Sequence, residues 1–588
     1  MYEHNDTLKP KVAVCILILI LGIAAAFRFI GLDWDGHAHL HPDERFLTMV
    51  TTGISWPKDL QQYFDTNVSP LNPQNNGFSF YVYGTYPIHL TKFVAMVLHN
   101  DTYDGVTLVG RALSGILDLA TLITVYLIAS YLTKKRITGL IAAACYAVFV
   151  LPIQLSHFFT VDPYVTLFIT VVLWRILRSK FDFITGVMLA FAVGAKASAV
   201  IIVPIIALAY ALEWPWAGHT TAVRQKRRHM LLMACGCLIG FLLTVRIVYP
   251  YLFVGMTLNP KILANWRELS SFDSPNTTFP PGLQWITVTP IQPILDLLVW
   301  GLGIPLGLLT VIAIGAGMVR AAKHVAKHTL MVILLVWIIF ALIYQAVQFA
   351  KPMRYFWPIY PSLAVMTGWY LTERIKHWRP VIWTAFMVVL LIWPVAYLNI
   401  YMHTTTRVSA NDWIYAHIPV GKTIAWESWD DPLPFPKNGF SPGVYHTPAL
   451  PVFDPDSPEK WAKIEAALAQ ADYLILSSNR GYGAMGRVKD RYPETYRYYQ
   501  LLINGSLGFR PVVQFVSRPA LPIPGLAVCI RPPGFSYGFL ADQLDTCKQT
   551  GITFVDDGTD ETFTVYDHPK VIIFQKVGTV NYSELLGK

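Results

Sequence analysis

The stretch that decides the fold is apolar: residues 12–32 read VAVCILILILGIAAAFRFIGL. A helix needs roughly 20 consecutive apolar residues to cross a bilayer core of about 30 Å, and this stretch is long enough. A dense polar segment follows directly at residues 33–46, DWDGHAHLHPDERF. Ionisable groups beside a membrane boundary are costly and tend to mark function, so this junction predicts a membrane protein with its chemistry at the membrane surface.

Similar apolar runs recur, and the sequence predicts about eleven spans. They are 12–32, 107–132, 138–156, 160–179, 181–195, 197–213, 229–255, 291–319, 329–350, 354–373 and 380–401. The pair that meets near Gly194 is the least regular. For the first run, a cleaved export signal ending near Ala24 is the alternative, and the length of the run disfavours it.

The composition agrees with this prediction. Of 588 residues, 54% are hydrophobic and only 14% are charged, with a net charge of +9. An ordinary soluble domain has about 25% charged residues, so a soluble multidomain enzyme is excluded. The basic residues are dispersed between apolar runs rather than gathered on one polar domain, which argues against nucleic acid as a partner.

Basic clusters fall in alternate loops, as the positive-inside rule requires of a correct span count. They are Lys9/Lys11, Lys134–Arg136, Arg175/Arg178/Lys180, Arg224–Arg228, Arg320/Lys323/Lys327 and Arg374/Lys376/Arg379. This pattern predicts an integral protein of the plasma (inner) membrane with a cytoplasmic N-terminus. The loop 33–106 and everything after residue 402 then lie outside the cytoplasm.

The tail changes composition, and we expect two domains: a membrane domain at 1–402 and an extracytoplasmic α/β domain at 403–588. Predicted strands are 421–426, 473–476, 512–516, 562–566 and 571–574, and residues 460–470 have the pattern of an amphipathic helix. Cys529 and Cys547 lie in this exported part, where a disulfide is permitted.

The acidic pair Asp43-Glu44 in the outer loop 33–106 is the first candidate site. A carboxylate there could take a proton from an attacking acceptor hydroxyl. The structural alternative is a helix N-terminus, because Pro42 suits the first helical position and acids favour the helix dipole. The two interpretations are compatible.

Histidines precede this pair at alternate positions. His37, His39 and His41 would share one face of an extended strand and could bind a metal with Asp43, although interfacial or hydrogen-bonded histidines are commoner. The segment Asp33-Trp34-Asp35 also has the Asp-x-Asp form of nucleotide-sugar enzymes, but that pattern is short and unspecific.

Four more ionisable residues map to the same predicted face. Asp162 could be a second acid or an ordinary helix cap. Lys196 could bind a phosphate or extend towards the interface, and Lys351 and Arg354 form another basic cluster suited to phosphate. Together they suit an anionic lipid headgroup and a hydroxyl to be deprotonated. Arg111, Asp118 and Asp296 are expected to form structural pairs between helices.

These motifs resemble the GT-C class of membrane glycosyltransferases, in particular the branch of protein O-mannosyltransferases and aminoarabinose transferases (glycosyltransferase family 39-like). The resemblance covers roughly residues 10–400. It is carried by Asp43-Glu44, by residues 109–114 (VGRALS), by His157 to Asp162, by Gly194-Ala195-Lys196, and by Arg354-Tyr355 before Pro358 and Pro361.

The resemblance implies an inverting hexosyl or pentosyl transferase that moves a sugar from a polyprenyl-phosphate carrier to a hydroxyl of a lipid, glycan or protein. It implies Asp43, Glu44 and Asp162 as catalytic acids, and Lys196, Lys351, Arg354 and Tyr355 around the donor phosphate. A metal is not required, although His37, His39 and His41 leave a divalent ion open.

Two other function classes remain. A transporter or flippase for a lipid-linked sugar would also place charges near lipid phosphates, but it needs polar helices through the membrane depth and usually paired repeats. A membrane anchor that presents the tail as a binding module would leave the charged clusters without a role.

Overall fold

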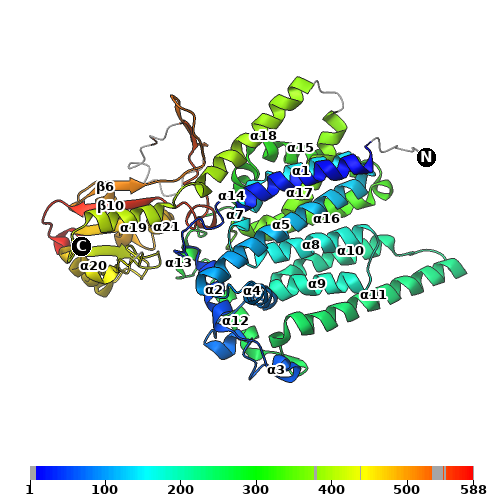
Figure 1. Cartoon of the computed structure of the whole chain (residues 1–588), viewed down its shortest axis with the longest axis horizontal. Helices are drawn as coiled ribbons and strands as arrows, with labels where there is room; N and C mark the ends of the chain where they lie inside the picture. Colours follow the sequence, from blue (N-terminus) through cyan, green and yellow to red (C-terminus); the bar gives the residue numbers. More distant parts are fainter. Residues whose placement is uncertain (1–7, 376–379, 438, 533–546, 548–550, 587–588) are drawn as a thin grey trace.

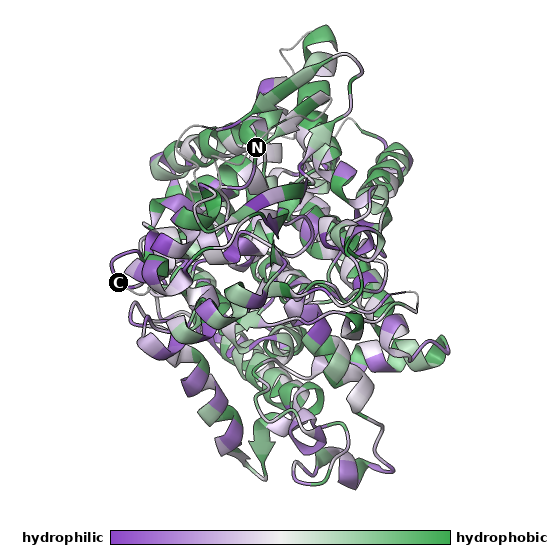
Figure 2. Cartoon of the chain, turned by 90° about the vertical axis from the view of Figure 1, so that its left-hand side faces the viewer, coloured by the Kyte–Doolittle hydropathy of each residue, from purple (hydrophilic) through white to green (hydrophobic). Residues whose placement is uncertain are grey.

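The computed structural model describes residues 8–375, 380–437, 439–532, 547 and 551–586. Helices from the first 401 residues run side by side in a bundle, and the strands of the tail gather at one end of it, on the left in Figure 1. Hydrophilic residues are mixed with hydrophobic ones on the face seen from that end (Figure 2). The short helices α2, α4 and α12 lie at this same end of the bundle.

The elements before residue 402 are mainly helical. They are α1 (Pro10–Phe29), α2 (Pro42–Gly53), α3 (Leu60–Phe64), η1 (Pro73–Asn76), α4 (Tyr86–Val97), α5 (Tyr103–Thr133), α6 (Arg136–Ala147), α7 (Val150–Ser156), α8 (Asp162–Leu177), α9 (Phe183–Ala195), η2 (Ala197–Ile202), α10 (Val203–Glu213), α11 (Thr221–Val248), η3 (Pro250–Leu252), β1 (Phe253–Val254), β2 (Thr257–Leu258), α12 (Pro260–Ser271), α13 (Pro280–Leu283), α14 (Ile291–Asp296), η4 (Leu297–Gly301), α15 (Ile304–Lys323), η5 (Val325–Lys327), α16 (Thr329–Ala346), η6 (Met353–Ile359), α17 (Tyr360–Ile375) and α18 (Pro380–Tyr401).

Within the described ranges, six helical segments are long and apolar enough to cross a membrane: α1, α5, α11, α15, α16 and Val381–His417, which covers α18 from its second residue and continues to the end of the helix after it. The pair α6 and α7 would make a seventh, bent by 62°. Each predicted span falls on one or more helices, but α8 has 16 residues and α9 only 13. Residues 291–319 are interrupted at Gly303, whose φ of 82° ends one helix before α15 begins. The total of about eleven spans stays a prediction.

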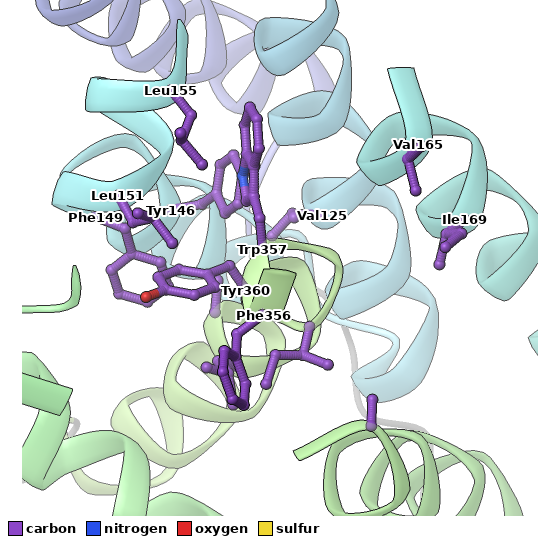
Figure 3. Close-up of a cluster of buried hydrophobic side chains, with 14 of the residues drawn as sticks. Val125, Tyr146, Phe149, Leu151, Leu155, Val165, Ile169, Phe356, Trp357 and Tyr360 are labelled. Atoms are coloured by element: carbon purple, nitrogen blue, oxygen red, sulfur yellow. The ribbon is translucent and has the colours of Figure 1, made fainter. Parts of the chain in front are cut away.

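A buried aromatic cluster holds η6 in the bundle. Figure 3 shows Phe356, Trp357 and Tyr360 packed among residues of the α5–α8 region, including Tyr146 and Phe149. The Trp357 indole N–H donates a hydrogen bond to the Tyr146 hydroxyl at 3.2 Å. This anchor fixes the backbone that carries Arg354 and Tyr355.

The tail contains two sheets. Its elements are α19 (Thr406–His417), β3 (Ile424–Glu427), η7 (Pro442–Val444), β4 (Ala449–Leu450), α20 (Pro458–Gln470), β5 (Tyr473–Leu476), α21 (Arg480–Arg487), α22 (Pro493–Ile503), β6 (Phe509–Phe515), β7 (Ala520–Leu521), β8 (Ala527–Ile530), β9 (Gly551–Phe554), α23 (Glu561–Thr564), β10 (Val571–Lys576) and α24 (Tyr582–Leu586). The five-stranded sheet has the order β4-β3-β5-β10-β6, and the three-stranded sheet has the order β7-β9-β8. β3 runs parallel to β4 and β5, whereas β10 is antiparallel to β5 and β6.

Most of the predicted elements of the tail are present. The predicted strand 473–476 coincides with β5, 571–574 lies within β10, and 460–470 lies within α20. The strand predicted at 562–566 is wrong, because Asp560 accepts a hydrogen bond from the Thr562 amide and starts the short helix α23 there. Cys529 and Cys547 are joined by a disulfide.

Candidate active site

A small cavity brings together four of the predicted site residues. It has a volume of about 10 Å³ and is lined by Asp43, Leu47, Tyr83, Thr160, Val161, Asp162, Lys196 and Arg354. The four ionisable residues come from α2, the start of α8, the link between α9 and η2, and η6. Folding therefore joins two carboxylates and two cations in one place, although Asp43 and Arg354 are 311 positions apart.

Asp43 lies in the first turn of α2, with Pro42 at the first helical position, so the helix-start interpretation is correct. The side chain that caps this helix is His41, so the Asp43 carboxylate is not used for capping. Its Oδ2 accepts a hydrogen bond from Nη1 of Arg354, which is its one hydrogen-bond partner among the described residues. The side chain is 28% exposed. Burial alone would raise the pKa of this carboxyl, but the positive charge of Arg354 outweighs it and holds the pKa below its usual value.

Two polar atoms at the cavity lack partners within the described part of the chain. They are Nε of Arg354 and Oγ1 of Thr160, both buried. Buried polar groups in folded proteins are nearly always hydrogen-bonded, so such atoms require an explanation. An oxygen-rich anion in the cavity would satisfy both, because each can donate a hydrogen bond.

Lys196 and Asp162 form an ion pair at 3.1 Å. Asp162 is the first residue of α8 but makes no capping hydrogen bond, so its carboxylate serves Lys196 rather than the helix terminus. The Lys196 ammonium also lies 4.3 Å from the centre of the Tyr355 ring. This aromatic contact holds the cation beside the cavity.

Glu44 is placed differently from its neighbour Asp43. Its two oxygens accept hydrogen bonds from Arg111 at 2.5 and 2.9 Å, and one also accepts from the Phe159 amide at 2.7 Å. Arg111 additionally pairs with Asp35 at 3.0 Å. Glu44 is fully buried and does not line the cavity, so its observed contacts hold α2 against α5.

Lys351 does not join the cavity either. Its ammonium donates to the carbonyl oxygen of Phe349 at 3.0 Å, and the residue is buried. The two residues of this basic cluster therefore separate, with Arg354 facing Asp43 and Lys351 turned towards its own backbone.

The three histidines are not brought together. His37 and His39 have φ angles of 63° and 51°, so the segment is not the extended strand that would align them. Their contacts diverge: His37 lies 3.4 Å from Asp33, His39 lies 2.8 Å from Asp104, and His41 accepts from the Glu44 amide at 3.3 Å. Across the described residues, no group of three or more His, Cys, Asp or Glu side chains is placed to hold a metal. These residues do not fit a metal site.

A second charged cluster joins the tail to the bundle. His568 lies between Asp556 at 2.9 Å and Asp567 at 2.5 Å, and all three are buried. Asp567 also accepts hydrogen bonds from Tyr401 at 2.6 Å and Gln154 at 3.1 Å. Burial alone would lower the pKa of His568, but the two carboxylates raise it to about 10. The sequence offered no motif for this cluster, because its partners Tyr401 and Gln154 lie 166 and 413 positions from Asp567.

The same part of the tail borders the site. The ring of Tyr566 lies 4.3 Å from the ring of His41, two residues before Asp43. The amide of Met353, next to Arg354, donates to Asp560 at 2.9 Å. The segment 556–568 thus supports both α2 and η6 where they carry the cavity residues.

No family model matches the sequence, and neither does any curated protein. Solved structures similar to the chain include the archaeal oligosaccharyltransferase AglB from Archaeoglobus fulgidus in complex with an inhibitory peptide and a dolichol-phosphate, with 12% identity, coverage of 83% of this chain and 72% of that one, and a TM-score of 0.47. An oligosaccharyltransferase from the same organism in complex with Zn and sulfate has 12% identity, coverage of 82% and 71%, and a TM-score of 0.45.

ArnT from Cupriavidus metallidurans bound to undecaprenyl phosphate is also similar, with 13% identity, coverage of 69% and 73%, and a TM-score of 0.44. These similar structures belong to the GT-C class, which the sequence motifs also resemble. At such scores, function has to be inferred from the side chains of the site.

Proposed function

We propose that this chain is an integral membrane glycosyltransferase of the GT-C class. In this proposal it transfers a sugar from a polyprenyl-phosphate carrier to an acceptor hydroxyl, with inversion at the anomeric carbon. The observation that carries the proposal is the cavity in which the Asp43 carboxylate faces Arg354 and Lys196, with Arg354 Nε and Thr160 Oγ1 unsatisfied within the described structure.

The chemistry follows from these groups. Asp43 accepts the proton of the acceptor hydroxyl as its oxygen forms a bond to the anomeric carbon. The bond between that carbon and the phosphate oxygen breaks, and the electron pair leaves with the phosphate. Arg354, Lys196 and the Thr160 hydroxyl stabilise the negative charge that develops there.

The cavity has about the volume of a single water molecule, so donor binding requires it to widen. Arg354 now pairs with Asp43, and a phosphate would compete for the same guanidinium. We infer that Arg354 exchanges Asp43 for the donor phosphate, which leaves the Asp43 carboxylate free to act as the base. Glu44 then acts as a positioning residue: its hydrogen bond from Arg111 holds α2, and with it Asp43, in place.

The topology of the proposal is the one expected from the basic clusters. The N-terminus is cytoplasmic, the cavity opens on the extracytoplasmic face of the plasma (inner) membrane, residues 1–402 form the catalytic domain, and residues 403–588 form a separate domain. Lys376 and Arg379, two members of the last basic cluster, lie outside the described residues. Lipid, glycan and protein hydroxyls all remain open as acceptors.

The test is to incubate the purified full-length protein with a panel of radiolabelled polyprenyl-phosphate sugars and to follow the release of polyprenyl phosphate. We expect Asp43→Asn to lower the release rate by about 10² to 10⁴-fold, the usual contribution of a general base. A parallel reaction with EDTA should proceed at the same rate as the untreated one.

Asp101→Asn is the matched control, because Asp101 is an exposed carboxylate that does not line the cavity, and its rate should equal that of the unmodified chain. Unchanged release by Asp43→Asn would remove Asp43 from the base role. Binding of the lipids without turnover of any donor would favour the transporter or flippase instead.

A further inference from the structure

A second cavity in the protein lies away from the candidate active site. It has a volume of about 520 Å³ and is lined by α3, the three residues after it, the end of α11 and the β1–β2 turn. It shares no lining residue with the Asp43 cavity. Cavities that bind small molecules usually measure about 300–1,000 Å³, so this one has a suitable size.

Two hydrogen bonds build its walls. The Tyr63 hydroxyl donates to the carbonyl oxygen of Ile247 at 2.6 Å, and the Thr66 hydroxyl donates to that of Phe253 at 2.5 Å. They tie the segment around α3 to the end of α11 and to β1. The cavity is therefore a structured part of the fold rather than a gap beside a loose loop.

Arg246 supplies the positive charge of this cavity. Its guanidinium lies 5.5 Å from the centre of the Phe64 ring and 5.3 Å from that of Phe253, and Nη1 donates to the carbonyl oxygen of Pro250 at 2.8 Å. No carboxylate within the described structure forms an ion pair with it. Because a guanidinium has five N–H donors, several remain for a ligand.

Asp65 supplies an opposite charge on the same wall. It is exposed, and one of its carboxylate oxygens accepts a hydrogen bond from the Asn67 amide at 3.0 Å. A cavity that offers both a guanidinium and a carboxylate favours a ligand that carries both a negative and a positive group.

The position of the cavity indicates where such a ligand comes from. α11 is the least buried of the helices long and apolar enough to cross a membrane, at 17%, and its last turns leave the side chains of Leu243 and Ile247 exposed. Leu60 on α3 is 75% exposed and Met256 in the β1–β2 turn is 97% exposed. Exposed apolar side chains around the end of a membrane helix are typical of the level of the lipid headgroups.

We propose that this cavity binds the headgroup of a membrane phospholipid that combines a phosphate with an ammonium group. Arg246 contacts the phosphate, Asp65 contacts the ammonium, and Leu60 and Ile247 lie beside the acyl chains. This inference does not depend on the glycosyltransferase proposal, and its test does not use transfer activity.

The test is a thermal-unfolding titration of the full-length protein in maltoside detergent. The ligands are dihexanoyl-phosphatidylethanolamine, dihexanoyl-phosphatidylglycerol and inorganic phosphate. We expect phosphatidylethanolamine to raise the Tm at a concentration at least about tenfold lower than phosphatidylglycerol does, with no effect of phosphate. A tenfold difference in affinity corresponds to about 1.4 kcal/mol, which one charged hydrogen bond, here from the ammonium to Asp65, can supply.

Arg246→Gln should abolish the shift and Arg246→Lys should restore part of it. Asp65→Asn should remove the preference between the two lipids. Lys58→Gln is the matched control, because it removes an exposed charge from the same loop without touching the cavity, and it should behave as the unmodified chain.

Equal shifts with both lipids, a full shift in Arg246→Gln, or a shift with inorganic phosphate alone would each overturn the proposal. If Arg246→Gln does not fold, Asp65→Asn decides the matter, because Asp65 is exposed, and an unchanged lipid preference in that variant would contradict the site.

Discussion

The Asp43 cavity and the Asp556–His568–Asp567 cluster are both built from opposite charges, but they differ in how completely those charges are satisfied. In the cluster, the side chains are at most 1% exposed, and both ring nitrogens of His568 contact a carboxylate. In the cavity, Asp43 is 28% exposed, and Arg354 Nε and Thr160 Oγ1 have no partner in the described part of the chain.

This difference in hydrogen bonding suits different roles for the two groups of charges, a structural role for the cluster and a functional role for the cavity. A fully hydrogen-bonded buried network repays the cost of removing its charges from water and makes its surroundings rigid. An incompletely satisfied group of charges costs stability, so it persists where a ligand completes it. The contacts of the cluster hold the tail against the bundle. In our proposal, the cavity instead binds the anionic phosphate of the donor.

The largest effect on stability should come from the cluster. Asp567→Asn leaves the His568 charge with one carboxylate and weakens the contacts to Tyr401 and Gln154, and breaking a buried pair costs about 3–5 kcal/mol. We expect a clear fall in Tm at pH 7, measured by thermal unfolding in detergent. Asp412→Asn, which breaks an exposed pair with Lys437, should change it by no more than about 1 kcal/mol and serves as the control.

The same cluster predicts how stability depends on pH. The pKa of His568 is raised to about 10, so the folded protein holds a proton that the unfolded chain releases near pH 6.5. The stabilisation is complete below about pH 6.5 and is lost as the pH rises towards 10. This dependence should be weaker in Asp567→Asn; an unchanged slope would show that another group produces it.

A smaller effect, this time on activity, should come from Thr160. Thr160→Val keeps the shape of the side chain but removes the hydroxyl that we assign to the phosphate, and a hydrogen bond to a charged group contributes about 1.5–3 kcal/mol. We expect kcat/KM for the lipid-linked donor to fall by about 10- to 100-fold, with an unchanged Tm.

The matched control is Thr166→Val. Thr166 lies in α8, six residues after Thr160. It also has a buried hydroxyl without a partner among the described residues, but it does not line the cavity. Its kcat/KM should be unaffected. Equal losses in both variants would mean that the loss in Thr160→Val reflects side-chain packing rather than a contact with the phosphate.

The sequence predicted the members of the cavity better than their neighbours. Asp43, Asp162, Lys196 and Arg354 could be found because each is an ionisable residue next to an apolar run, where charges are costly and tend to mark function. Glu44 could not be separated from Asp43, since consecutive residues of a helix point in different directions and their partners come from distant segments. Thr160 gave no signal because a threonine beside a membrane helix is ordinary.

Other features were predicted wrongly or not at all. The predicted alignment of His37 and His39 assumed an extended backbone, which their left-handed conformations exclude. The strand predicted at 562–566 followed from alternating residues, but the Asp560 cap favours a helical turn there. The buried cluster around His568 was invisible because its partners on α7 and α18 are far away in sequence.

The finest test of the comparison is the pH profile of transfer. In the proposed mechanism Asp43 must be ionised to accept the proton, so kcat/KM should fall as the pH drops through the pKa of Asp43. Burial raises this pKa and the Arg354 charge lowers it, so Arg354→Gln should move the acidic limb of the profile to higher pH. Arg354→Lys keeps the positive charge, so the acidic limb should stay nearly at the same pH even if the maximum kcat/KM falls. A limb that stays fixed in Arg354→Gln would mean that Asp43 is not the titrating base. The charges of the Asp43 cavity would then have no more claim to a catalytic role than those of the Asp556–His568–Asp567 cluster.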